Sequence, residues 1–160
     1  MASPVQTGTV TLNAAFLHDI KQLSRELHRR LDRVHRMCSR PRMVECRPRA
    51  LSRMLARLRD DLAMHFSLEE FLGYFDEPVE VAPWMSERAN ALRREHSDLY
   101  AEISRISELA DSFVSQERLS LVTKKIPARF NSFFSRLKSH ESREVDLIME
   151  SLNRDIGVGD

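Results

Sequence analysis

Glycine and proline, the residues that most often interrupt helices, are scarce in this sequence. Only 4 glycines and 6 prolines occur among its 160 residues, of which 31% are charged. Such a composition favours long helices joined by few turns. A chain of this length has enough residues for one sizeable hydrophobic core. We therefore expect an all-α protein with a single domain over residues 1–160.

Other absences exclude whole classes of function. The sequence has no run of about 18 apolar residues that could span a membrane. Its N-terminus, MASPVQTGTV, has neither the basic start nor the apolar core of a signal peptide. Its two cysteines, Cys38 and Cys46, are too few for a disulfide scaffold, so we expect a cytoplasmic location. No glycine-rich phosphate loop is present, and no serine or cysteine stands out as a nucleophile.

The formal net charge of +1 at pH 7 gives no overall preference for nucleic acid or for an acidic membrane. The charges are nevertheless uneven, because the segment from Arg25 to Arg59 contains 12 arginines and 3 acidic residues. Arginines on solvated helix faces are the common explanation. The alternative is that this face of the first two helices docks an acidic protein partner. Because the segment offers no aromatic platform for bases, we expect no nucleic-acid partner.

Apolar residues recur at the spacing of an amphipathic helix in four parts of the chain. The predicted helices cover residues of about 13–39, 48–75, 83–114 and 117–153. Between the first two we expect a short basic loop from Pro41 to Pro48, and between the next two a connection from Asp76 to Pro83. Pro127 should kink the last helix or separate its first turns. Four long helices with short connections predict an antiparallel, up-and-down four-helix bundle.

The spacing His-x-x-x-Glu occurs twice, as His65–Glu69 on the second predicted helix and as His140–Glu144 on the fourth. Residues four apart lie on the same face of a helix, one turn from each other. A third histidine, His96, lies between leucines on the third helix, and leucines flank the other two histidines at helical spacing. All three should therefore point inward. At about 1.5 Å of rise per residue, they also fall at similar depths in the bundle.

Burying two glutamates and three histidines at one level is costly unless a cation compensates them. A lone inward histidine is most often an ordinary core residue, but this combination predicts a metal site. Carboxylates mixed with imidazoles suit iron or manganese better than they suit a thiolate-type zinc site. Carboxylates contributed by different helices commonly hold two such ions in a helical bundle.

These residues resemble those of the hemerythrin-like (HHE, cation-binding) four-helix bundles. The matching motifs are HFSLEE at residues 65–70, REH at 94–96 and HESRE at 140–144, and the resemblance covers nearly the whole chain. It implies a non-haem centre of two iron ions (Fe2+/Fe3+), bridged by an oxo or hydroxo group. Glu69 and Glu144 would be the bridging carboxylates. His65, His96 and His140 would be the terminal ligands.

The sequence departs from the family pattern on two helices. Family members usually have a ligand histidine on the first helix, where apolar matching places Ser24 opposite His96. Three alternatives remain: His28, one turn deeper, supplies the ligand; His18 does so from an irregular first turn; or water fills the position at Ser24. Tyr100 stands where many members have a second histidine on the third helix. It is either a core tyrosine bonded to a neighbour such as His28, or a phenol that ligates iron or donates to a bound small molecule.

The resemblance implies a redox or sensing protein that binds or reduces dioxygen, nitric oxide or a peroxide in the bundle core. Whether that makes it a di-iron oxidoreductase is left open by the sequence. One alternative is a metal-dependent regulatory or interaction module without catalysis. Another is a degenerate bundle with an incomplete metal site, which is suggested by Ser24 at the position where the family usually has a ligand histidine.

Overall fold

A computed structural model of the protein describes residues 14–71 and 83–157. The described elements are α1 (Ala14–Cys38), α2 (Pro41–Cys46), α3 (Pro48–Phe71), the 3-10 turn η1 (Pro83–Met85), α5 (Ser86–Ser115) and α6 (Leu119–Gly157). No β-strand occurs within these two ranges, so the prediction of an all-α protein is confirmed.

The four predicted long helices are found, with boundaries shifted by a few residues. The last residues of the second predicted helix, the first residue of the first one and most of the connection from Asp76 to Pro83 lie outside the described residues. The predicted loop between Pro41 and Pro48 is wrong, because this segment forms α2. Pro41 suits the first turn of a helix, and fully buried Val44 fixes the segment to the core.

Helix α6 continues through Pro127, so the proline does not separate its first turns as one alternative predicted. Ile126 and Phe130 are fully buried on either side of the proline. Their packing against the core stabilises the helical path at the point where the proline removes one backbone hydrogen bond.

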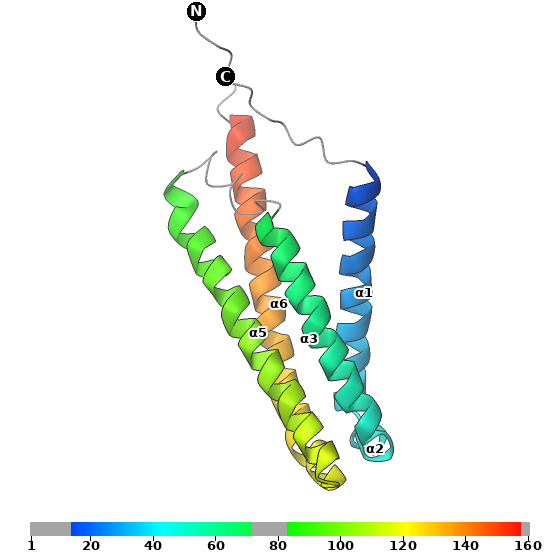
Figure 1. The fold of residues 1–160 in the computed structure, drawn as a ribbon. Helices are drawn as coiled ribbons and strands as arrows, with labels where there is room; N and C mark the ends of the chain where they lie inside the picture. Colours follow the sequence, from blue (N-terminus) through cyan, green and yellow to red (C-terminus); the bar gives the residue numbers. More distant parts are fainter. Residues whose placement is uncertain (1–13, 72–82, 158–160) are drawn as a thin grey trace, which may run out of the picture.

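The four long helices lie side by side (Figure 1). Helix α5 packs against α6 and α3, and α1 packs against α3 and α6. In the view of Figure 1, α1 and α5 descend along the chain, whereas α3 and α6 ascend. Short α2 lies at the lower end, between the end of α1 and the start of α3.

The buried apolar side chains form two separate clusters. The larger one includes Leu62 and Phe66 on α3, Leu99 on α5 and Leu137 on α6. The smaller one consists of Met85, Ala89, Leu92 and Leu147. Along α5 the chain passes from the small cluster to the large one between Leu92 and Leu99, and His96 lies between them. On α6 the same interval contains His140 and Glu144. A buried polar layer therefore separates the two apolar clusters.

Three Arg–Glu ion pairs join α5 to α6 at intervals of two turns. Arg88 contacts Glu150 at 2.6 Å, Glu95 contacts Arg143, and Glu102 contacts Arg136. Each step is seven residues forward on α5 and seven residues back on α6. This series is consistent with one register along the seam, in which the central pair, Glu95–Arg143, lies beside the polar layer.

Candidate metal centre

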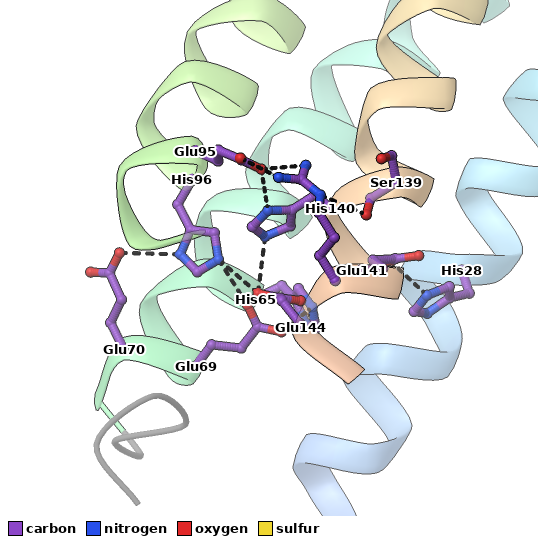
Figure 2. Close-up of polar contacts among 11 residues, drawn as sticks. His28, His65, Glu69, Glu70, Glu95, His96, Ser139, His140, Glu141 and Glu144 are labelled. Carbon is purple, nitrogen blue, oxygen red and sulfur yellow. Dashed lines mark hydrogen bonds and ion pairs between the residues drawn. The ribbon is translucent and has the colours of Figure 1, made fainter. Parts of the chain in front are cut away.

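Helices α3, α5 and α6 bring five predicted site residues together in the polar layer. His65 and Glu69 come from α3, His96 from α5, and His140 and Glu144 from α6. Figure 2 shows the glutamates and histidines of this group pointing toward one another. His96, His140, Glu144 and Glu69 are buried, with between 1% and 9% of their surface exposed. The side chain of His65 is 21% exposed and forms the outer edge of the group.

The Nε2 atoms of the histidines lie close to the carboxylate oxygens. His96 Nε2 lies 3.1 Å from Glu144 Oε1 and 3.3 Å from Glu69 Oε2. His140 Nε2 lies 2.9 Å from Glu144 Oε1, and His65 Nε2 lies 2.9 Å from Glu69 Oε1. Each carboxylate thus contacts imidazoles from two helices: α5 and α6 for Glu144, α3 and α5 for Glu69.

These separations fit the edges of a metal coordination shell. An ion about 2.1 Å from its ligands has neighbouring ligand atoms about 3.0 Å apart at right angles and about 3.4 Å apart in a tetrahedron. The observed distances, 2.9 to 3.3 Å, fall in that interval. Ligand atoms of His96, His140 and Glu144 all lie within 4.8 Å of one another, so this group could hold a metal ion.

Two buried atoms of the layer have no hydrogen-bond partner among the described residues: Glu69 Oε2 and His140 Nε2. Although His140 Nε2 is 2.9 Å from Glu144 Oε1, the two groups are not aligned as donor and acceptor. A buried polar atom without a partner costs about 1–3 kcal/mol. A cation bound to both atoms would remove that cost, so the donor set fits a metal.

The opposite nitrogens of the two buried imidazoles are held by carboxylates. His140 Nδ1 donates to Glu95 Oε2 at 2.9 Å, and His96 Nδ1 donates to Glu70 Oε1 at 3.3 Å. Both contacts are drawn in Figure 2. Metal-binding histidines typically donate their other N–H to a carboxylate or a carbonyl, which fixes the ring and directs the lone pair to the ion. The sequence motifs contain Glu70 and Glu95, but we predicted no role for either.

Arg143 in turn holds Glu95 through two hydrogen bonds, of 2.6 Å and 2.8 Å, in a bidentate pair. Burial would raise the pKa of the Glu95 carboxyl, but Arg143 and His140 outweigh it and lower that pKa. Glu95 is therefore ionised and accepts a hydrogen bond from His140 Nδ1–H. Arg143 lies three residues after His140 and so shares a helix face with it, but no local pattern in the sequence indicates its pairing with Glu95 on another helix.

The ionisation of the layer follows from its contacts. Burial would raise the pKa of Glu144, but the neighbouring imidazoles of His140 and His96 outweigh it and lower the pKa to about 2. Burial would lower the pKa of His140, yet Glu144 and Glu95 outweigh it and raise that pKa. Glu144 is thus an anion at neutral pH. A proton on His140 and a metal cation would be competing ways to balance it.

His28 is not brought into this group. Its Nδ1 donates to the Ser24 carbonyl at 2.7 Å, and its Nε2 donates to Glu141 Oε1 at 2.9 Å. Figure 2 shows the ring beside Glu141 and apart from the other histidines. Both ring nitrogens thus contact Ser24 and Glu141, and His28 lies outside the group of His96, His140 and Glu144 that could hold a metal ion. The side chain of His18 lies outside the described residues.

Tyr100 is 40% exposed and lies in a shallow pocket of about 250 Å³, together with Ser67, Glu70, Ser97 and His96. It is neither a core tyrosine nor a hydrogen-bond partner of His28, which the structure joins to Glu141 instead. Glu70, which accepts the hydrogen bond of His96 Nδ1, also lines this pocket.

Comparisons with known protein families, with curated proteins and with solved structures find no match to this chain. Among the described helices, none combines the length and the apolar character needed to cross a lipid bilayer. The cysteines Cys38 and Cys46 are free, and burial raises the pKa of the Cys38 thiol to about 12.

Proposed function

We propose that this protein is a non-haem di-iron protein of the hemerythrin-like kind, built as an antiparallel up-and-down four-helix bundle. The observation that carries the proposal is the buried polar layer, in which Glu69 Oε2 and His140 Nε2 have no hydrogen-bond partner among the described residues. Imidazole nitrogens from three helices and two carboxylates converge there, with neighbouring donor atoms 2.9 to 3.3 Å apart. Mixed nitrogen and oxygen donors of this kind suit iron or manganese.

In this proposal Glu69 and Glu144 are the bridging carboxylates, since each contacts imidazoles of two helices. His65, His96 and His140 are terminal ligands. When bound, the ions supply a binding position for dioxygen, nitric oxide or a peroxide, and the electrons for its reduction.

Residues around the layer orient its ligand side chains and limit the access of water to it. Glu95 and Glu70 direct the imidazoles of His140 and His96 inward. The two apolar clusters close the layer above and below, which strengthens its electrostatic interactions. None of the side chains described on α1 joins the group, because His28 is bonded to Glu141. We propose that the small molecule binds on this α1 side, where the family has its additional histidine.

Metal analysis of the purified protein tests the proposal. The protein is loaded with Fe2+ without oxygen, and bound iron is counted per chain. We expect two irons in the parent protein and a loss of iron in His140→Ala and Glu69→Ala. His35→Ala is the matched control, since that histidine is held by Asn131 and stacks on Phe134 away from the layer. A parent protein that binds no iron would contradict the proposal and would favour a degenerate bundle.

The loaded protein is then exposed separately to oxygen, nitric oxide and hydrogen peroxide, and its absorption spectrum is recorded. Changes in the iron bands are expected with at least one of them. Iron that responds to none of the three would favour a metal-dependent interaction module instead. Counting bound iron in His28→Ala and in His18→Ala tests whether either histidine of the first helix is a ligand. We expect His28→Ala to retain both irons.

A further inference from the structure

A second pocket, of about 630 Å³, lies far from the polar layer. It is formed where the end of α2, the first turns of α3 and the first turns of α6 meet. Its lining includes Arg47, Arg49, Arg53, Ser120, Thr123 and Lys124. Along α3, Pro48 at the pocket and His65 at the layer are about 25 Å apart at 1.5 Å per residue. The pocket is therefore separate from the candidate metal centre.

The charge of this pocket is mostly uncompensated. Of its four basic side chains, only Arg49 is paired, and its partner is Glu117, at 2.8 Å and 2.9 Å. No hydrogen bond or ion pair joins the side chains of Arg47, Arg53 and Lys124 to the described residues. The lining contains one acidic residue, Glu45. Three free cations around one concave surface produce a local field that attracts an anion.

The neutral donors of the pocket match the same kind of ligand. Ser120 and Thr123 bring two hydroxyl groups from α6. Helices α3 and α6 both begin at this pocket, at Pro48 and Leu119. Pro48 has no N–H, and the N–H groups of Leu51 and Leu121 donate to the carbonyls of Arg47 and Arg118. The remaining N–H groups of the two first turns have no acceptor within their helix, and the helix dipole favours negative charge there. The pocket thus combines free cations, hydroxyls and two helix starts around one space.

We propose that this pocket binds a small molecule that carries a phosphate group. Guanidinium groups, hydroxyls and helix N-terminal amides are the donors that bind phosphate oxygens in proteins. The volume, about 630 Å³, lies within the range of small-molecule clefts, roughly 300–1,000 Å³. The site belongs to the arginine-rich part of the sequence, and it gives three of those arginines a common ligand. It does not depend on the proposed metal function.

Isothermal titration of the full chain with pyrophosphate, and separately with inorganic phosphate, tests this site. Ionic strength is held constant with chloride, because exposed cations also attract ions without specificity. We expect saturable binding at one site per chain, tighter for pyrophosphate, and at least a tenfold loss of affinity in Arg53→Gln. The double variant Arg47→Gln with Lys124→Gln should lose binding entirely.

Arg57→Gln is the matched control, because Arg57 is exposed one turn beyond Arg53 on α3 and lies outside the pocket lining. It removes the same charge and should leave the affinity unchanged. An equal loss in Arg57→Gln and Arg53→Gln would overturn the proposal, because it would show unspecific attraction to the basic surface. Binding that does not saturate, or that persists in the double variant, would overturn it as well. Far-ultraviolet circular dichroism of each variant verifies that its helix content is retained.

Discussion

The large apolar cluster and the polar layer beside it are built on opposite principles. In the cluster, side chains such as Phe130, Phe133 and Leu55 are fully buried and contain no polar atom that needs a partner. Burial of such surface stabilises the fold by about 25 cal/mol per Å². The polar layer buries ionisable groups at a cost, and two of its atoms have no hydrogen-bond partner among the described residues. Such a layer is costly for stability, which supports the proposal that it binds a metal ion.

If this comparison is right, the largest loss of stability will come from the apolar cluster. Phe130→Ala should lower the free energy of unfolding by about 3–5 kcal/mol, because it leaves a cavity in a packed core. Urea denaturation of the metal-free protein measures this loss. Val145→Ala, at a position 58% exposed on the same helix, should change it by under about 0.5 kcal/mol. A similar small change in Phe130→Ala would remove the contrast between the two regions.

The polar layer should instead respond to metal. Free Fe2+ at 100 times its dissociation constant should raise the free energy of unfolding by about 2.7 kcal/mol for each ion bound, since only the folded protein has the site. In Glu144→Gln most of this gain should disappear, because the variant lacks the anion that contacts both His96 and His140. Thermal unfolding under argon, with and without Fe2+, gives the comparison. An unchanged gain in the variant would show that the ion binds elsewhere.

Glu95 and Glu102 allow a finer comparison along the α5–α6 seam. Each forms an ion pair with an arginine of α6, but only Glu95 also accepts a hydrogen bond from a histidine, His140. We expect Glu95→Gln to weaken Fe2+ binding by about 10-fold or more, the usual effect of losing such a support. Glu102→Gln loses a similar ion pair and should leave the affinity unchanged. Titration with a competing chelator measures the Fe2+ affinity of both variants. Equal losses of affinity would mean that the two ion pairs affect only the stability of the fold.

The smallest effect should come from His28, outside the layer. The hydrogen bond that His28 donates to Glu141 raises the pKa of His28, against a smaller opposing effect of burial. Its contribution to stability is thus present below the ordinary pKa of 6.5 and is lost as the pH rises through the raised value. Because the side chain is 39% exposed, solvent limits this contribution to under about 1 kcal/mol.

His28→Ala should therefore lower the free energy of unfolding at pH 6 and have less effect at pH 9. Urea denaturation at the two pH values checks this. At acidic pH the partner also matters. Burial would raise the pKa of Glu141, but His28 and Lys138 lower it, so the contribution of Glu141 is lost as the pH falls below its ordinary value of 4.5. A pH-independent effect of His28→Ala would show that the pair contributes nothing.

The helices and the inward face of the site were predictable because both follow from local periodicity. His96 and His140 lie among leucines and phenylalanines spaced three or four residues apart, and both are buried as this spacing predicts. Tyr100 shows the limit of the same argument. Four residues turn an α-helix by about 400°, which leaves Tyr100 roughly 40° away from His96. That offset places it at the edge of the buried face, where it is 40% exposed.

Contacts between helices could not be predicted in this way. Glu95 precedes His96 by about 100° of helix rotation, so the sequence alone places it on a different face. It meets His140 only because α5 and α6 pack in the register marked by their three Arg–Glu pairs. The helical spacing of His28 placed it on the inner face of α1 and made it a candidate ligand, but in the structure its Nε2 atom contacts Glu141 of α6. Short α2 was missed because six residues with two prolines nearby carry no clear periodicity.

The sequence by itself determined the helices, their apolar faces and the five ionisable side chains that must lie inside, because these depend on the order of residues along one helix. The tertiary structure decided which carboxylate holds which imidazole, that His28 of α1 pairs with Glu141, and that three arginines meet around one pocket. Those facts depend on the rotation and register of one helix against another. Each is set by the packing of the whole core, which no single segment encodes.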